Sequence, residues 1–353
     1  MNKFKDYFDA LVETLLQQDG SDIHLTAGLA PALRINGELV FLEGHQKLLK
    51  EDIDGILAAV LTEKNLATFT FHHDLDFSYQ YKESTRLRGN AFVSQSIPGA
   101  TFRLIPQVKT VAELNLPSIL SEFARKRQGF FLVVGPVGQG KSATMAAMVD
   151  VINSEKASHI LTIEDPIEYA FAQKKSIITQ REVGLDVESF EIGLKGALRE
   201  DVNTILIGEM RNTETIGAAV TAAETGHLVL STLHTNNASQ TIDRIIDSFP
   251  AGKQDQIRTQ LAGSLLGIFS QRLIPRMSGG RVPAYELLIN NTAVANLIRE
   301  KRTHEIDSVI ETSAELGMID MNRSLIELVR QGQITVKDAF MYSNNPKNLE
   351  RML

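Results

Sequence analysis

The chain has 353 residues, of which 43% are hydrophobic and 22% charged, as in ordinary globular proteins of about two domains. Its formal net charge of −7 disfavours nucleic acid and anionic membrane surfaces as partners of the chain as a whole. There is no cysteine, which excludes disulfides, thiolate zinc sites and thiol nucleophiles. The first residues are amphipathic and unlike a signal peptide, and no apolar run is long enough to span a bilayer. We therefore expect a cytoplasmic protein without membrane insertion.

The first hundred residues combine helical patterns with alternating strand patterns. Apolar residues at helical spacing from Phe4 to Leu15 predict a helix, and a second helical pattern covers residues 50–70. Between them we expect a strand at 22–28 and a hairpin around Asn36-Gly37, because that pair is a strong two-residue turn signal. Three further strands are expected, at 74–81, 86–93 and 100–106. Helices set apart from an antiparallel sheet predict a small α+β domain over residues 1–105.

A proline-bounded stretch without clear periodicity, residues 106–117, is the predicted linker. From residue 118 to residue 353 the pattern becomes that of an α/β domain. Four apolar runs have the length and continuity of parallel strands buried on both faces, at 130–134, 159–163, 204–208 and 227–232. Helical patterns at 142–153, 189–200 and 213–225 lie between them. This alternation predicts a doubly wound domain whose ligands bind at the carboxyl ends of the strands.

The region after Ser239 is expected to be mainly helical. An apolar stripe through Ile257, Leu261, Leu265 and Ile268 predicts a long helix that ends before Arg272. Residues 282–289 are the one late strand that the pattern indicates, and short helices are expected after it.

The first chemical signal is a complete G-x-x-x-x-G-K-[ST] sequence between a strand pattern and a helix pattern, which is the context of a phosphate-binding P-loop. Its glycines allow backbone N–H groups to turn inward, and the helix that follows presents free N–H groups to an anion. The alternative is a glycine-rich turn without a ligand. We expect the following residues to bind nucleotide: Gly135, Pro136, Val137, Gly138, Gln139, Gly140, Lys141, Ser142 and Ala143.

Acidic residues stand at the ends of two strands that follow the P-loop. Hydrolysis of a phosphoanhydride needs a carboxylate to orient water and oxygen ligands for Mg²⁺. We predict that Glu164 orients the water and that Glu168 supports the metal. Glu209 and the hydroxyl of Ser142 are the predicted metal ligands. Taken alone, each acid also fits a solvated loop or a strand-end cap.

Two histidines bracket the last predicted strand, and several arginines supply positive charge. His227 and His234 could each hydrogen-bond a phosphate-side acid or water, although a strand-end histidine is often only structural. Arg88 and Arg103 lie on neighbouring strand patterns of the first domain, and Arg272 follows the predicted long helix. Composition and spacing alone do not select one of them for catalysis.

The motifs GPVGQGKS, TIEDPIEY, ILIGEMR and TGHLVLSTLHT occur in this order, and together they resemble the Walker A, Asp box, Walker B and His box of the secretion-type ATPase superfamily. Shorter stretches over nearly the whole chain resemble the type IV pilus retraction ATPases within it. These are GSDIHLTAG, RINGEL, QRLIPR, ANLIRE and LGMIDMNRSL.

The resemblance implies a hexameric ring of chains, each with a PAS-like N-terminal domain and a RecA-like ATPase domain. It implies Mg-ATP hydrolysis between subunits at the inner face of the cytoplasmic membrane, acting with an inner-membrane platform protein to drive pilus retraction and twitching motility. By position, Glu164 matches the catalytic glutamate and Glu209 the Walker B glutamate. His227 and His234 match the His-box pair. In the same way, Arg88 and Arg103 match basic residues that approach the nucleotide of the neighbouring subunit.

The chain departs from the family pattern at several positions. Val137 and Gln139 stand where the family usually has Thr and Ser, and Ala143 replaces a Thr. Ser96 and Ala295 stand where arginines are frequent, the latter within the retraction motif. The alternatives are an accessory retraction ATPase, a secretion or assembly ATPase, and a nucleotide-binding regulator with slow turnover. A nucleic-acid motor is disfavoured by the acidic balance.

Overall fold

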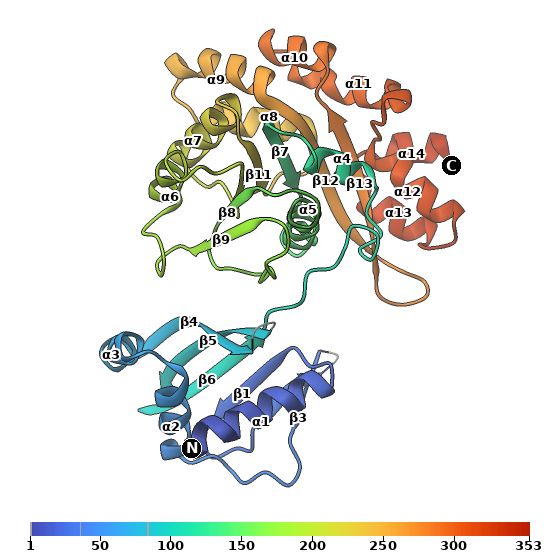
Figure 1. The fold of residues 1–353 in the computed structure, drawn as a ribbon. Coiled ribbons are helices and arrows are strands. Elements are labelled where there is room, and N and C mark those ends of the chain that lie inside the picture. Colours follow the sequence, from blue (N-terminus) through green and yellow to red (C-terminus); the bar gives the residue numbers. More distant parts are fainter. Residues whose placement is uncertain (1, 36, 83–84) are drawn as a thin grey trace. The chain divides into compact units, whose positions relative to one another are not determined.

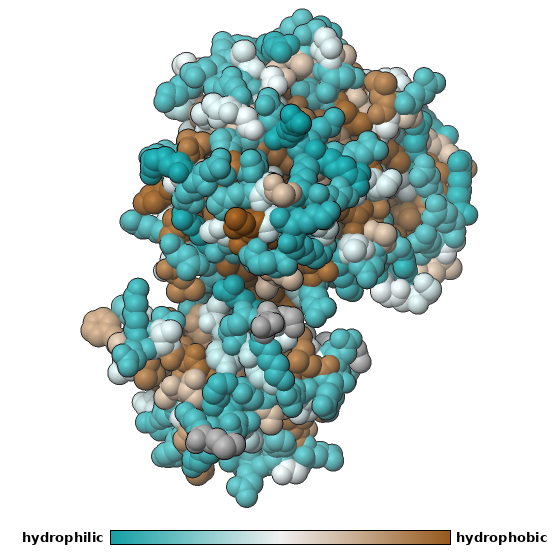
Figure 2. All heavy atoms as spheres, in the orientation of Figure 1, coloured by the Kyte–Doolittle hydropathy of each residue, from teal (hydrophilic) through white to brown (hydrophobic). Residues whose placement is uncertain are grey.

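The computed structural model describes residues 2–35, 37–82 and 85–353, and it divides into two compact units, Met1–Gln107 and Val108–Leu353 (Figure 1). The boundary falls within residues 106–117. Among the described residues, no helix combines the length and the apolar character needed to cross a membrane. On the face drawn in Figure 2, hydrophilic side chains cover most of the surface and apolar ones lie scattered between them.

The first unit is an antiparallel sheet with helices on one face. The sheet order is β3-β2-β1-β6-β5-β4, and every neighbouring pair is antiparallel. The strands are β1 Asp22–Thr26, β2 Ala32–Ile35, β3 Glu38–Phe41, β4 Asp74–Lys82, β5 Thr85–Ser94 and β6 Ile97–Leu104; the helices are α1 Lys3–Gln17, α2 Lys50–Val60 and α3 Glu63–His72. This arrangement confirms the predicted α+β class.

Local sequence explains the elements of this unit. Asn2 begins α1, since its side chain accepts a hydrogen bond from the Phe4 N–H. The helix buries its apolar face on the sheet, with the ring of Phe8 centred 4.4 Å from that of Phe102. The single helical pattern at 50–70 forms two helices, because Thr62 begins α3 as a new N-cap. The predicted hairpin is present between β2 and β3, although Asn36 of its turn lies outside the described residues.

The second unit is built on a sheet of order β13-β12-β7-β11-β10-β8-β9. Neighbouring strands from β12 to β9 run parallel, and β13 is antiparallel to β12. The strands are β7 Gly129–Val134, β8 His159–Glu164, β9 Ile177–Glu182, β10 Thr204–Ile207, β11 Leu228–Leu233, β12 Leu265–Pro275 and β13 Arg281–Ile289.

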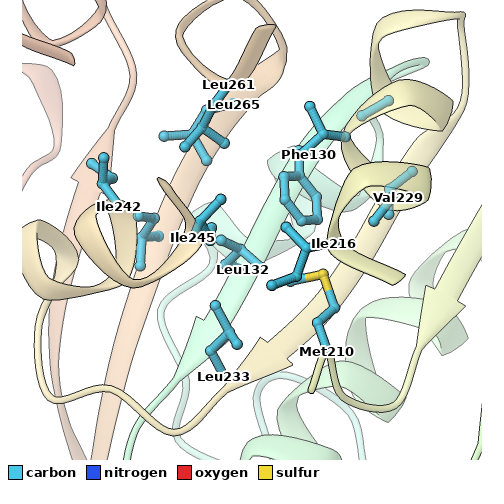
Figure 3. Packing of buried hydrophobic residues seen from close by; sticks show 14 of the residues in the cluster. Phe130, Leu132, Met210, Ile216, Val229, Leu233, Ile242, Ile245, Leu261 and Leu265 are labelled. Atoms are coloured by element: carbon cyan, nitrogen blue, oxygen red, sulfur yellow. The ribbon is translucent and has the colours of Figure 1, made fainter. Parts of the chain in front are cut away.

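Helices cover both faces of this sheet. Alternate residues of β7 enter different cores: Phe130 and Leu132 pack on one face, and Phe131 and Val133 on the other. In Figure 3, Phe130 and Leu132 lie close to Ile216 of α7 in the first of these cores. The doubly wound α/β class is therefore confirmed. The helices flanking the parallel strands are α4 Ile119–Ala124, α5 Lys141–Glu155, α6 Phe190–Ala197, α7 Thr213–Glu224, α8 Ala238–Asp247 and α9 Ala251–Ser264.

Two strands of this sheet were not predicted. The helix expected to run through Leu265 and Ile268 is wrong, because α9 ends at Ser264 and β12 begins at the next residue. The apolar spacing of three to four residues fitted a helix, but pairing with β7 and β13 buries this segment as a strand. Arg272 therefore lies within β12. The edge strand β9 escaped notice because its last four residues, Thr179–Glu182, are polar.

The last three helices of the chain form a C-terminal cluster on the β12–β13 hairpin, whereas the two α-helices before them bury side chains in the core of the parallel sheet. Ile274 of β12 and Val282 of β13 are buried with Met321, Leu325 and Leu349. The cluster thus shares its core with the strand that also borders the P-loop. The C-terminal elements are α10 Thr292–Arg299, the 3₁₀ turns Thr303–Glu305 and Ala314–Leu316, α11 Ile306–Thr312, α12 Met321–Arg330, α13 Val336–Tyr342 and α14 Pro346–Met352.

Candidate functional site

The P-loop lies between β7, which ends at Val134, and α5, which begins at Lys141. Three of its glycines, Gly135, Gly138 and Gly140, have φ angles of 146°, 76° and 79°, which side chains rarely adopt. A Cβ atom on Gly135 would also lie only 2.4 Å from the carbonyl oxygen of Gln271. The loop therefore needs glycine both for its backbone angles and for its close contact with β12.

A pocket of about 590 Å³ opens beside this loop at the carboxyl ends of the strands. P-loop residues 137–143 form one wall, and the polar side chains of the other walls come from the strand ends and the loops after them. Those that sequence reasoning selected are Glu164, Glu168, Glu209 and His234. A cavity of this size with a few convergent polar groups is typical of a small-molecule site. The structure thus brings together most of the predicted site residues of the second unit.

Lys141 lies folded against the loop that precedes it. Its Nζ donates hydrogen bonds to the carbonyl oxygens of Gly135, at 2.8 Å, and Pro136, at 2.9 Å. Burial lowers the pKa of this ammonium, and the negative charges of Glu168 and Glu209 act in the opposite direction. The positive charge of Lys141 therefore lies against the P-loop, where it could contact anionic phosphates.

Glu164 is the last residue of β8, and its carboxylate is buried. Oε1 accepts hydrogen bonds from the Thr162 hydroxyl at 2.6 Å and from the Gln180 side chain at 3.3 Å, and Oε2 lies 3.5 Å from the Glu168 N–H. Burial is the main cause that raises the pKa of Glu164 to about 7, against these hydrogen bonds. A carboxylate with such a pKa is suited to proton transfer near neutral pH.

His234 connects the P-loop lysine with the acid at the end of the neighbouring strand. Its Nδ1 lies 3.3 Å from Nζ of Lys141, and its Nε2 lies 3.4 Å from the Glu209 carboxylate. A neutral ring protonated at Nε2 fits both contacts, since it accepts from the ammonium and donates to the carboxylate. Arg211 also pairs with Glu209 and lies 3.6 Å from the Asp165 carboxylate. The residues after β10 and β11 thus form one charged network.

The site has the donor set that Mg²⁺ prefers, but not a complete set of protein ligands. Ser142, Glu168 and Glu209 line the pocket and offer hard oxygen atoms. In the part of the chain that the structure describes, no group of three or more His, Cys, Asp or Glu side chains could hold a metal ion by itself. This fits a metal that keeps waters and is shared between a hydroxyl, one or two carboxylates and substrate phosphates.

The other predicted site residues lie elsewhere. His227 precedes β11 at its amino end and hydrogen-bonds the Ala222 carbonyl oxygen at 3.0 Å, so it does not line the pocket. Arg88 and Arg103 face each other on β5 and β6 of the first unit. The buried carboxylate of Asp22 accepts a 2.7 Å hydrogen bond from Nε of Arg103, whose side chain remains 70% exposed.

Several residues at the site were not selected from the sequence. Thr162 could have been found, because it points to the same side of β8 as Glu164 two residues later. Gln180 lies on the unpredicted strand β9, and Gln271 on the unpredicted strand β12. Arg211 stands two residues after a strand-end acid, a pattern too common to be informative.

Comparison with known proteins identifies the family. The sequence pattern described as "Type II/IV secretion system protein" matches residues 110–341. The chain is also 42% identical to the Type IV pilus retractation ATPase PilT of Pseudomonas aeruginosa over 94% of this chain and 96% of that one. The chain belongs to the Type II/IV secretion system protein family. Within that family it is most readily compared with pilus retraction ATPases.

Two further comparisons agree with this placement. The Type IV pilus ATPase PilU of Pseudomonas aeruginosa is 38% identical, with coverage of 98% of this chain and 91% of the relative. The crystal structure of the pilus retraction motor PilT with bound ADP superposes with a TM-score of 0.91 at 44% identity, covering 98% of this chain and 99% of that one. This Type II/IV secretion system protein therefore has the ATPase fold that its motifs predicted.

Proposed function

We propose that this chain hydrolyses Mg-ATP and uses the energy to drive retraction of type IV pili, and hence twitching motility. The observation that carries the proposal is the pocket in which a complete P-loop meets Glu164, Glu209 and His234. Similarity to PilT over nearly the full length of both chains supports the mechanical role.

Each residue of the pocket has a part in this reaction. The P-loop amides and Lys141 would hold the β- and γ-phosphates, since both are aligned at the start of α5. Glu164, held by Thr162 and Gln180, would orient the attacking water and accept its proton. A bound Mg²⁺ would neutralise phosphate charge, with Ser142 and Glu209 as its protein ligands and Glu168 in support.

The contacts of His234 would make the metal-side carboxylate respond to phosphate binding. His234 bonds Lys141 and Glu209 at the same time, so a change in the lysine on phosphate binding would reach the metal-side carboxylate through one ring. In this proposal Arg88 and Arg103 act on the nucleotide of a neighbouring chain. The exposed guanidinium of Arg103, fixed by the buried Asp22, has the freedom at its outer end that such a role requires. His227 has no part in the pocket of its own chain.

The working form in this proposal is a homo-hexamer in the cytoplasm, bound to an inner-membrane platform protein of the pilus machinery. Gel filtration with and without Mg-ATP tests the assembly. A species of six 39.0 kDa chains is expected with nucleotide, and a monomer under both conditions would contradict the hexamer.

The decisive experiment for the chemistry is Glu164→Gln. The amide keeps the size of the side chain but cannot accept the proton, so we expect Mg-ATPase to fall at least 100-fold while ATP binding persists. Glu191→Gln, on the exposed side of α6 and paired only with Lys195, is the matched control and should hydrolyse ATP at the normal rate. Hydrolysis by the Glu164 variant at the normal rate would contradict the assignment.

An accessory retraction ATPase, which the sequence left open, is the second candidate, because the chain is also 38% identical to a second pilus ATPase of Pseudomonas aeruginosa, PilU, over nearly its whole length. The two roles differ in whether the ATPase alone is enough to retract pili. In a piliated strain that lacks its own retraction ATPases, a main motor restores twitching when it is expressed alone. An accessory ATPase restores it only together with a second retraction ATPase.

A further inference from the structure

Strand β12 continues beyond its partner β7 and borders the P-loop. The parallel pairing of the two strands ends where Ser270 lies opposite Val134, and β7 then turns into the loop. The next residues of β12, Gln271 to Leu273, still pair with β13 on one edge, but on the other edge they border the P-loop in place of β7. The contact is close, as the clash of a Cβ on Gly135 with the Gln271 carbonyl indicates.

Gln271 connects the P-loop with the first turn of α5. Its buried side chain donates a 2.9 Å hydrogen bond from Nε2 to the carbonyl oxygen of Gln139. Its Oε1 accepts a 2.6 Å hydrogen bond from the Thr144 hydroxyl in the first turn of α5. The carbonyl of Gln139 can only accept, so the orientation of the Gln271 amide follows from its partners. One side chain thus joins the loop backbone to the helix.

Gln139 completes the connection from the opposite side. Its side-chain Oε1 accepts a 2.7 Å hydrogen bond from the backbone N–H of Leu273. This N–H points away from β13, toward the edge of β12 where β7 no longer pairs. The glutamine oxygen therefore accepts a hydrogen bond that a carbonyl group of a neighbouring strand would otherwise accept. A serine, the residue that the family resemblance led us to expect here, is two bonds shorter and cannot reach Leu273 from the same backbone.

These contacts join the loop and β12 reciprocally. The side chain of Gln271 bonds the backbone of the loop, and the side chain of Gln139 bonds the backbone of β12. Arg281 of β13 adds a 3.3 Å hydrogen bond to the Gly138 carbonyl oxygen. All the loop groups in these bonds are acceptors, so none of these bonds uses a backbone N–H of the loop that could face an anion. Fixing a loop in its bound shape reduces the ordering cost of ligand binding.

We propose that Gln271 is a positioning residue for the P-loop and that Gln139 strengthens this action in the present chain. The two glutamines hold the loop in its phosphate-binding shape before nucleotide arrives, and their effect is on nucleotide affinity and not on the chemical step. This inference rests on the proposed ATPase function and extends it to two glutamines that act through the shape of the loop.

The test uses the full-length chain with Gln271→Leu and Gln139→Ser, and calorimetric titration with ADP. Gln271→Leu removes two hydrogen bonds, and we expect ADP affinity to fall about tenfold. Gln139→Ser removes one, and the expected loss is about threefold. The KM for ATP should rise by similar factors with kcat within about twofold of the parent, the signature of lost ground-state binding. Gln254→Leu is the matched control, since the side chain of Gln254, on α9, bonds the carbonyl oxygen of Phe249 just before that helix and does not contact the P-loop.

A second measurement separates positioning from general stability. The melting temperature of each variant without nucleotide is compared with its ADP affinity. Lower melting temperatures with unchanged affinity in both variants would overturn the inference and leave the ATPase function standing. Failure of the parent chain to bind ADP would overturn both. Should Gln271→Leu fail to fold, Gln139→Ser decides alone, because its side chain lies at the surface of the pocket.

Discussion

Thr162 and Glu164 lie two residues apart on β8, and the threonine hydroxyl donates a 2.6 Å hydrogen bond to the glutamate carboxylate. Gln180 of the edge strand β9 donates to the same oxygen. These bonds favour the charged carboxylate, whereas burial favours the neutral form and raises the pKa of Glu164 to about 7. The proposed base is therefore balanced close to neutral pH by two opposing effects.

Thr162→Val should shift this balance toward the neutral acid. The variant keeps the shape of the side chain but removes the strongest hydrogen bond to the charged carboxylate, so the pKa of Glu164 rises further. Because a base must be deprotonated, the acid limb of the kcat–pH profile should move upward by about one pH unit. Steady-state ATPase assays from pH 5.5 to 9 measure it. A profile that coincides with that of the parent chain would show that Glu164 is not the titrating base.

His234→Phe should uncouple the P-loop lysine from Glu209. The phenyl ring fills the space of the imidazole but bonds neither Lys141 nor the carboxylate. We expect kcat to fall at least tenfold, in the range of losses seen when one positioned polar group is removed from an active site. His227→Phe serves as the comparison, since His227 lies at the other end of β11. Equal losses in both variants would contradict a special role for His234 within the pocket.

Gly135→Ala and Gly138→Ala should differ in severity although both glycines have positive φ angles. At Gly138 nothing lies within 4 Å of an added Cβ, so the cost is only the backbone conformation, about 1–2 kcal/mol. At Gly135 the new atom would lie 2.4 Å from the Gln271 carbonyl, and β12 would have to move. Thermal unfolding and ADP titration of both variants should show the larger loss for Gly135→Ala, and the reverse order would refute the contact.

Glu286→Gln should stabilise the protein at alkaline pH. The carboxyl of Glu286 is buried on β13, and burial raises its pKa to about 7 from an ordinary value of 4.5, with Asp307 and Asp320 adding to the rise. The folded chain therefore keeps a proton that the unfolded chain releases above pH 4.5. Stability from the neutral group is complete below pH 4.5 and is lost as pH rises to about 7.

The glutamine variant stays neutral at every pH and still accepts the 2.8 Å hydrogen bond from the Ala238 N–H. At pH 8 we expect it to be more stable than the parent chain by on the order of 1–3 kcal/mol, and at pH 5 nearly equal. Melting curves at the two pH values measure the difference. A gain of the same size at both values would mean that the protonation of Glu286 is not responsible.

Features that depend on local sequence were predictable. The unbroken apolar run at 130–134 allowed only a buried strand, and the loop after it had the complete P-loop pattern. Glu164 and Glu209 could be proposed as site residues because each directly follows such a run. The parallel topology then brings both acids to one edge of the sheet.

Features that depend on tertiary pairing were not predictable. The spacing of Leu261, Leu265 and Ile268 suits a helix, and only the contacts with β7 and β13 make the second half a strand. The four polar residues of β9 are tolerated because this strand lies at the edge of the sheet. For that reason Gln180 and Gln271, which hold the base and the P-loop, could not have been found from the sequence. His227 and His234 could not be distinguished from the sequence. They lie at opposite ends of β11, and only His234, at the carboxyl end, lines the pocket.

The β12–β13 hairpin contacts both the P-loop and the C-terminal helices. Gln271 and Leu273 touch the P-loop, and Ile274, the very next residue, is buried among α12, α13 and α14. N–H···O hydrogen bonds fall within a narrow range of about 2.7–3.2 Å, so a slide of this strand would lengthen or misalign the bonds that hold the loop. A force on the C-terminal helices would therefore reach the phosphate site through one strand, β12. A motor stalled under load would release its nucleotide by that route.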